Sequence, residues 1–423
     1  MLHLAETTNP WGGHSWVGDS PSAVTLDNRP LYEPATGPEA TASRGVCSKL
    51  FHSSLFDVGI LRDTLLPSIT FHSGLSLIAY GAGRLTDRLE TKDWLWPAGQ
   101  VLNAWWSALG KRVICDGIPL YCSWAIIDRP QRLLLAGVTL WGSRLFWRIA
   151  SRSVKRGGDD PRYEATKKQH GWSWNKALFT TYLPEALFQS LITLPFIAPF
   201  RHLVGSDVPG PCATLSGGYA AVVEAVAVGL FSMGFALEVL ADWQLDTFKE
   251  KEKSGQESPS AMCREGVWSI VRHPNYLGDM LVHLSFPLIL WSSNSLQPIH
   301  LLGPLTNYIF LRYVSGDKEN EHSQARRYST ENVNKKIDFD KYRREENAFW
   351  PDKCQVSNKW TWIVVGAGVA GWKAVGMGLV AMEMGLSIGS ELGFNEVMVL
   401  AKEGQDVAKL LAGSGLDLTD FFA

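Results

Sequence analysis

Four residues, Arg272, His273, Pro274 and Asn275, stand directly before an apolar run that begins near Tyr276. Proline has a fixed φ and no backbone N–H, so Pro274 suits the first turn of a helix. The first N–H groups of a helix lack partners, and the helix dipole adds partial positive charge there. Together with the guanidinium of Arg272, such a helix start is suited to binding a phosphate. An ordinary helix start, with Arg272 reaching a membrane surface, explains the same residues.

A second candidate site is a charged stripe at the end of an apolar run. Glu238, Asp242, Asp246 and Lys249 follow one another at intervals of four, four and three residues, which places them on one face of a helix. Glu238 and Asp242 fall at or near membrane depth, where an ionisable group is costly and is usually paired or functional. An arginine or a ribose hydroxyl would be a natural partner. The alternative is a solvated helix end with an internal ion pair to Lys249.

Arg144 lies inside another apolar block, between Ser143 and Leu145. A buried guanidinium needs an acceptor, because an unpaired buried charge is strongly destabilising. We expect this acceptor to be either a carboxylate such as Asp242 or a phosphate group of a ligand.

The elements that would position these residues are apolar blocks separated by polar loops. A membrane-spanning helix needs about 20 mostly apolar residues. The candidate spans are approximately residues 64–84, 94–110, 130–150, 177–200, 217–241, 276–293 and 299–314. We therefore predict an all-α protein, a transmembrane helix bundle of about six or seven spans. A soluble helical protein is the alternative, but residues 222–239 are interrupted only by Glu224 and Glu238, which disfavours it.

Basic residues gather in three of the loops, near residues 148–168, 249–272 and 312–344, whereas residues 204–218 contain no Lys or Arg. The positive-inside rule places the three basic loops in the cytosol. They could together receive a phosphorylated cofactor. The net formal charge of −2 gives no indication of a nucleic-acid partner.

The ends of the chain and its cysteines carry little further chemistry. Residues 1–54 are rich in Pro, Gly, Ser, Thr and Ala, have no signal-peptide pattern, and predict a disordered tail. The six cysteines show neither CxxC nor Cys/His spacing. We therefore expect free thiols, with no metal site and no disulfide framework.

Several of these motifs, in the same order, resemble the steroid 5α-reductase C-terminal family, and within it a branch of uncharacterised membrane proteins. The matching pieces are Leu140 to Leu145, Asp160-Pro161-Arg162-Tyr163, Leu187-Phe188-Gln189 through Pro195, Glu238, Ala241-Asp242-Trp243-Gln244, Phe248-Lys249, Gly266-Val267-Trp268, Arg272-His273-Pro274-Asn275-Tyr276, Gly278, Ser315-Gly316, Glu321, Tyr342 and Pro351. The resemblance covers approximately residues 85–352.

The resemblance implies a reductase domain over residues 55–352, in which NADPH delivers a hydride to a carbon–carbon double bond conjugated to a carbonyl. The substrate would be lipophilic, and the protein would lie in the endoplasmic reticulum membrane with the cofactor site facing the cytosol. By analogy, Asn275 and Asp279 contact the nicotinamide end, while Asp242 and Lys249 contact the ribose and phosphates. The further cofactor contacts implied are Arg272, Arg144, Arg162, Tyr276 and Glu238.

The chain also departs from the pattern of that family. Asp279 replaces the usual Glu and Leu277 the usual Phe. The residues that activate the substrate carbonyl have no alignable counterpart. Asp93 is the one candidate for a catalytic residue, and a helix N-cap at the membrane surface is the simpler explanation of it.

Two other functions are compatible with the arginine-histidine-proline motif. It is similar to that of the isoprenylcysteine carboxyl methyltransferases, which bind S-adenosylmethionine in a related membrane fold. The stripe of Glu238, Asp242 and Lys249 favours the reductase. A non-catalytic membrane protein that keeps the fold is the third hypothesis.

Residues 353–423 lie beyond the family pattern. Residues 362–371 form an apolar run into a GxGxxG motif, and a second apolar run with an acidic residue follows at 396–403. This order is typical of a dinucleotide-binding strand–turn–helix unit. It predicts a small α/β-like appendage, a truncated fragment without a catalytic role. An additional glycine-rich membrane helix is the alternative.

Overall fold

The computed structural model describes residues 61–201 and 217–391, and within these ranges the protein contains helices and no strand. The all-α part of the predicted fold class is thereby confirmed. The tail at residues 1–54, predicted to be disordered, lies outside the described residues.

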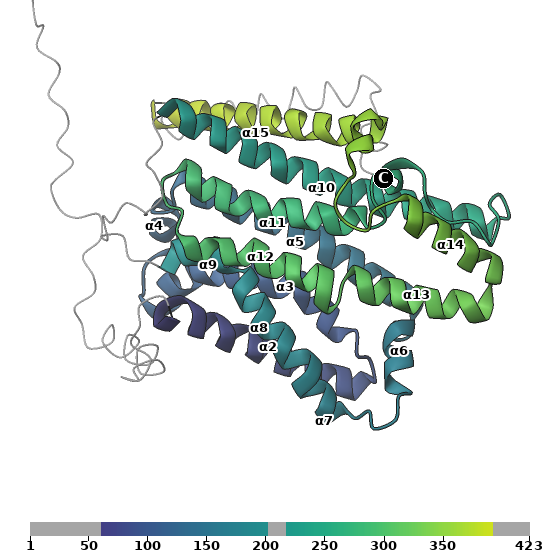
Figure 1. Ribbon diagram of the computed structural model, residues 1–423. Coiled ribbons are helices and arrows are strands. Elements are labelled where there is room, and N and C mark those ends of the chain that lie inside the picture. The colour runs from purple at the N-terminus through teal and green to yellow at the C-terminus, as the bar shows by residue number, and fades with distance from the viewer. Residues whose placement is uncertain (1–60, 202–216, 392–423) are drawn as a thin grey trace, which may run out of the picture.

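The helices run back and forth along one direction (Figure 1). The α-helices are α2 (Leu66–Thr86), α3 (Thr91–Trp105), α4 (Leu120–Ala125), α5 (Arg129–Arg156), α6 (Pro161–Lys167), α7 (Trp174–Ala177), α8 (Leu183–Ile192), α9 (Leu194–Arg201), α10 (Gly217–Lys253), α11 (Pro274–Ser292), α12 (Leu302–Ile309), α13 (Asp317–Glu331), α14 (Val333–Glu345) and α15 (Lys359–Glu391). Short π and 3₁₀ turns occupy η2 (Leu61–Leu65), η3 (Trp106–Cys115), η4 (Leu178–Tyr182), η5 (Gly266–Ser269), η6 (Pro298–Leu301), η7 (Phe310–Val314) and η8 (Lys353–Ser357).

Local sequence signals set the ends of the two helices that matter most for the site. At the start of α5 the Asp128 carboxylate accepts a hydrogen bond from the Gln131 backbone N–H, forming a capping box. The same helix ends at Gly157, whose φ of 71° is readily adopted only by glycine. Helix α11 begins at Pro274, as the sequence predicted.

Helices α10 and α11 approach each other closely enough for backbone contact. A Cβ added to Gly234 would lie 2.5 Å from the Gly278 carbonyl oxygen, and one added to Gly278 would lie 2.6 Å from the Gly234 carbonyl oxygen. Two glycines therefore form the crossing point. Beside it, buried side chains of α5, α9 and α11, among them Trp141, Phe196 and Phe286, form the main apolar core.

Within the described ranges, fewer helices have the length and apolarity of a membrane span than the sequence indicated. Among the described residues, one helix, Gly218–Lys253, is long and apolar enough to cross a membrane. Trp174–Ile192 and Leu194–Arg201 pass the same test together but are bent by 63°. The bundle of six or seven spans is therefore not confirmed. The expected blocks at 94–110 and 299–314 are helical but change into π or 3₁₀ turns along their length.

The C-terminal appendage is helical where it is described, so the predicted α/β-like unit is wrong there. Residues 362–371 lie within α15, which runs beside α10 (Figure 1). A Cβ on Gly368 would lie 2.8 Å from the Gly229 carbonyl oxygen, and one on Gly371 would collide with Ser232. These glycines therefore permit helix packing. The second predicted strand, at 396–403, lies outside the described residues.

The cysteines also differ in part from the expectation of free thiols. Cys115 is disulfide-bonded. Cys122, Cys263 and Cys354 are free.

Candidate functional site

The charged residues that the sequence singled out gather at one end of the bundle. Helices α6, α13 and α14 lie at this end, and α4 lies at the opposite end (Figure 1). Here α5 and α10 finish and α11 begins, so loops far apart in the sequence meet. We call it the basic end.

The stripe on α10 is paired with arginines of α5. Arg144 donates to the Asp242 carboxylate at 2.8 Å and also forms an ion pair with the buried Glu238. Arg148 lies 3.4 Å from Asp242 and donates to Asp246 at 2.9 Å. The acceptor expected for Arg144 is thus a carboxylate, and the stripe pairs with α5 instead of with Lys249.

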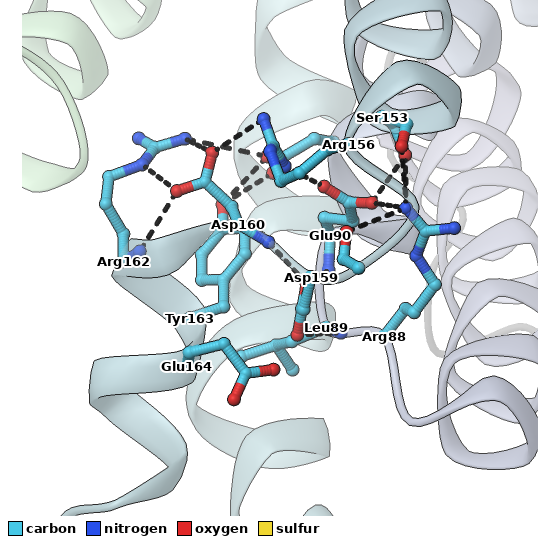
Figure 2. Close-up of polar contacts among 12 residues, drawn as sticks. Arg88, Leu89, Glu90, Ser153, Arg156, Asp159, Asp160, Arg162, Tyr163 and Glu164 are labelled. Carbon is cyan, nitrogen blue, oxygen red and sulfur yellow. Dashed lines mark hydrogen bonds and ion pairs between the residues drawn. The ribbon is translucent and has the colours of Figure 1, made fainter.

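A second network holds the loop after α5 against the start of α3 (Figure 2). The buried Asp159 accepts hydrogen bonds from the backbone N–H groups of Leu89 at 2.8 Å and Glu90 at 3.0 Å. Arg156 donates to the Glu90 carboxylate at 2.6 Å. Arg162 is hydrogen-bonded to Asp160 at 3.0 Å, so part of its donor capacity is used within the protein.

Asp93 lies in the first turn of α3, but it does not cap the helix, because the N-cap residue is Glu90. Its two carboxylate oxygens accept hydrogen bonds from the Tyr163 hydroxyl at 2.7 and 2.9 Å. Lys92 lies 3.1 Å from Asp93 and 2.6 Å from Glu185. Burial, and then the charge of Asp93, raises the pKa of Tyr163 well above its usual value, so the hydroxyl stays protonated.

Arg272 and His273 both bind Glu321 on α13. The guanidinium donates to the Glu321 carboxylate at 2.9 Å, and His273 Nε2 lies 3.0 Å from the same oxygen. Arg343 forms an ion pair with the other oxygen at 3.0 Å. Burial alone would raise the pKa of Glu321, but the hydrogen bond from His273 and the charge of Arg272 lower it to about 2. The expected phosphate contact, Arg272, is thus engaged in holding α13 and α14 to the start of α11.

Asp279 lies deeper in the bundle and is also satisfied internally. The Trp141 indole N–H donates to it at 2.8 Å and the Asn307 amide at 3.2 Å, and His283 Nε2 lies 3.7 Å away. No sequence pattern pointed to a function for Trp141, Asn307 or Glu321. Only the resemblance marked Trp141 and Glu321 at all.

Three of the polar side chains near the start of α11 make neither a hydrogen bond nor an ion pair with any described residue: Asn275, Lys249 and Arg152. Arg152, Arg148 and Arg327 lie close enough to Lys249 to repel its charge. Tyr276 interacts electrostatically with both Arg162 and Arg152. We call Lys249, Arg152 and Asn275 the unpaired group. Unpaired cations held together in this way form a local positive potential that favours an anion.

The fold and these contacts define a class of protein: a helical bundle whose basic end is built from arginine–carboxylate pairs and an unpaired anion-attracting group. A family model described as "Protein of unknown function (DUF1295)" matches residues 79–345, more than half of the chain, and the protein belongs to this family. No curated protein and no solved structure matches it.

Proposed function

We propose that this protein is a membrane reductase that uses NADPH to reduce a conjugated carbon–carbon double bond in a lipophilic substrate. The observation that carries the proposal is the unpaired group at the start of α11. Lys249 and Arg152 provide two cations that have no ion-pair partner among the described residues, and Asn275 provides a free amide. NADPH carries three phosphate groups and a nicotinamide amide, which these side chains complement.

The residues around the group explain how it is held in place. Glu238 and Asp242 fix Arg144, and Asp242 and Asp246 fix Arg148. These pairs give α5 and α10 a fixed relative position, so that Arg152 and Lys249 face the same space. We therefore assign Glu238 and Asp242 a positioning role, which differs from direct cofactor contact.

When bound, NADPH supplies the hydride, and the protein supplies orientation and proton control. The Tyr163 hydroxyl, kept protonated and hydrogen-bonded to Asp93, is a proton source at the same end of the bundle. Asp93 remains the candidate catalytic residue, and in this arrangement it acts through the tyrosine. The resemblance to the steroid 5α-reductase C-terminal family supports the choice of an enone substrate.

A membrane location agrees with the exposed apolar surface of the helices. Helix α10 is long and apolar enough to span a bilayer, and Leu140, Trp147, Val222 and Val226 are exposed on α5 and α10. With the basic end in the cytosol, the opposite end, which holds the disulfide-bonded Cys115, faces the lumen of the endoplasmic reticulum.

The experiment that tests the proposal is a thermal-shift assay on detergent-purified protein with NADPH, NADH and S-adenosylmethionine. A ligand that binds only the folded state raises the Tm by mass action. We expect NADPH to stabilise the wild type, and Lys249→Ala and Arg152→Ala each to weaken its binding roughly tenfold, the size of one charge-assisted contact. Added salt should reduce the difference.

The matched control is Lys251→Ala, which removes an exposed lysine two residues along the same helix. It should bind NADPH like the wild type. Stabilisation by S-adenosylmethionine alone would assign the protein to the methyltransferases. No response to any of the three ligands would support the non-catalytic hypothesis.

A further inference from the structure

The opposite end of the bundle carries a groove that the proposed reaction does not use. It has a volume of about 430 Å³ and runs along α5 from Arg132 to Ser143, with Trp105 and Trp124 as its walls. Leu135, Ala136 and Leu140 make most of its floor apolar. The groove begins one turn after the start of α5, close to α4, and ends near the middle of that helix.

Arg132 is the one charged residue that lines the groove. Its guanidinium lies over the Trp124 ring, 5.6 Å from the ring centre, and no carboxylate within the described ranges pairs with it. Its Nε is buried and makes no hydrogen bond there. The neighbouring Arg129, in contrast, donates to Glu224 at 2.7 Å. A buried donor on a cation without a counter-ion calls for an anionic acceptor.

The walls of the groove suit a hydrocarbon chain. The Trp105 and Trp124 rings are stacked, with centres 6.3 Å apart. The Trp105 indole N–H donates to the Thr139 hydroxyl at 2.9 Å, and that hydroxyl donates to the Leu135 carbonyl. Because these polar atoms are already hydrogen-bonded within the protein, an apolar ligand can lie against them without leaving a donor unpaired.

The length of the groove matches one leaflet of a bilayer. Arg132 and Ser143 are eleven residues apart on α5, which is about 16 Å along a helix axis. The hydrocarbon part of one leaflet is about 15 Å thick, half of the bilayer core. Arg132 and the two tryptophans would then lie at headgroup depth, where amphipathic aromatic rings are favoured.

We propose that this groove binds an anionic phospholipid, with its phosphate at Arg132 and one acyl chain along Leu135, Ala136 and Leu140. The site is independent of NADPH binding, because it shares no residue with the unpaired group. The observations that carry the proposal are the unpaired cation, the apolar walls and the match in length.

The test measures lipid retention by native mass spectrometry of detergent-purified protein after incubation with dioleoyl phosphatidylglycerol, dioleoyl phosphatidylcholine or oleate. We expect the wild type to retain phosphatidylglycerol over the other two. Arg132→Gln should reduce this retention roughly tenfold, as for the loss of one hydrogen bond to a charged group. Ala136→Trp should do the same by filling the groove while leaving Arg132 in place.

Arg129→Gln is the matched control, because it removes a cation at the same end that already has a carboxylate partner. It should keep the phosphatidylglycerol preference. A circular-dichroism melt of each variant establishes that it is folded, and Arg132→Lys, which keeps the charge, should retain part of the preference. Unchanged retention in folded Arg132→Gln, or preferential retention of oleate, would overturn the proposal.

Discussion

The Glu321 carboxylate connects three helices next to the unpaired group but is not itself one of the proposed cofactor contacts. It binds Arg272, His273 and Arg343, so the start of α11 is joined to α13 and α14 through a single side chain. Buried charge networks of this kind are sensitive to the loss of one member, because the remaining charges stay buried without a partner.

The pKa of Glu321 leads to a prediction about stability at acid pH. Its value of about 2 lies below the ordinary 4.5 of an unfolded chain, so ionisation of Glu321 stabilises the fold. This contribution is complete above about pH 4.5 and is lost as the pH falls toward 2. At neutral pH we expect Glu321→Gln to lower the free energy of unfolding by about 3 kcal/mol. Thermal melts of the two proteins should differ by the same amount from pH 7 to about 4.5 and converge as the pH is lowered from 4.5 toward 2.

Glu345→Gln provides the control for this prediction. Glu345 also forms an ion pair with an arginine, Arg264, but at an exposed position. Exposed pairs contribute little, so its melting temperature should stay close to that of the wild type. A melting difference between Glu321→Gln and the wild type that is the same at pH 7 and pH 2.5 would contradict the assignment.

At the scale of single residues, the sequence predicted what local pattern can reveal. The start of α11 at Pro274 and the need of Arg144 for an anionic acceptor both follow from residue type and spacing, and the structure supplies Asp242 as that acceptor. The hydrogen bond between Trp141 and Asp279 joins residues 138 positions apart. No local sequence pattern predicts such a contact, because it forms only when α5 packs against α11.

At the scale of elements, the crossing of α10 and α11 depends on two glycines. A Cβ on Gly278 would lie 2.6 Å from the Gly234 carbonyl oxygen and 2.8 Å from Glu238 Cγ. Since both neighbours belong to a packed helix, Gly278→Ala should separate the helices and lower the free energy of unfolding by about 1–3 kcal/mol. It should also weaken NADPH binding, because Glu238 helps to position Arg144.

Gly81→Ala is the matched control for the helix crossing. Gly81 also lies within a helix, α2, but a Cβ there would have no atom within 4 Å. Alanine is favoured over glycine in a helix by about 0.5–1 kcal/mol, so the melting temperature should rise or stay unchanged. Equal destabilisation by both substitutions would show that the close contact of α10 and α11 does not determine the effect.

Helix α15 illustrates why the type of an element can escape sequence analysis. The spacing of Gly366, Gly368 and Gly371 fits both a phosphate-binding turn and a small-residue face of a helix. The two possibilities differ in what lies opposite the glycines. In the structure Gly229 and Ser232 of α10 lie there, and this long-range contact is not encoded in the motif itself. The predicted spans were not confirmed for a related reason, since average hydropathy does not reveal where a helix bends or changes its turn type.

At the scale of the whole molecule, the proposed function requires a fixed orientation in the membrane. The basic end must face the cytosol, where NADPH is found, and the groove around Arg132 must face the other side. Two free cysteines, one near each end of the bundle, allow this orientation to be measured by chemical labelling. Cys354 is exposed in η8, directly before α15, and Cys122 lies in α4 at the opposite end (Figure 1).

We therefore predict that a membrane-impermeant maleimide added to sealed microsomes labels Cys354 and leaves Cys122 unlabelled. Cys122 should react only after the membrane is permeabilised. Cys263 should contribute little signal, because burial raises its pKa to about 12 and few thiolates form at neutral pH. Cys354→Ser and Cys122→Ser identify the source of each signal. Labelling of Cys122 before Cys354 would reverse the orientation, and would place the unpaired group on the side of the membrane that lacks its proposed cofactor.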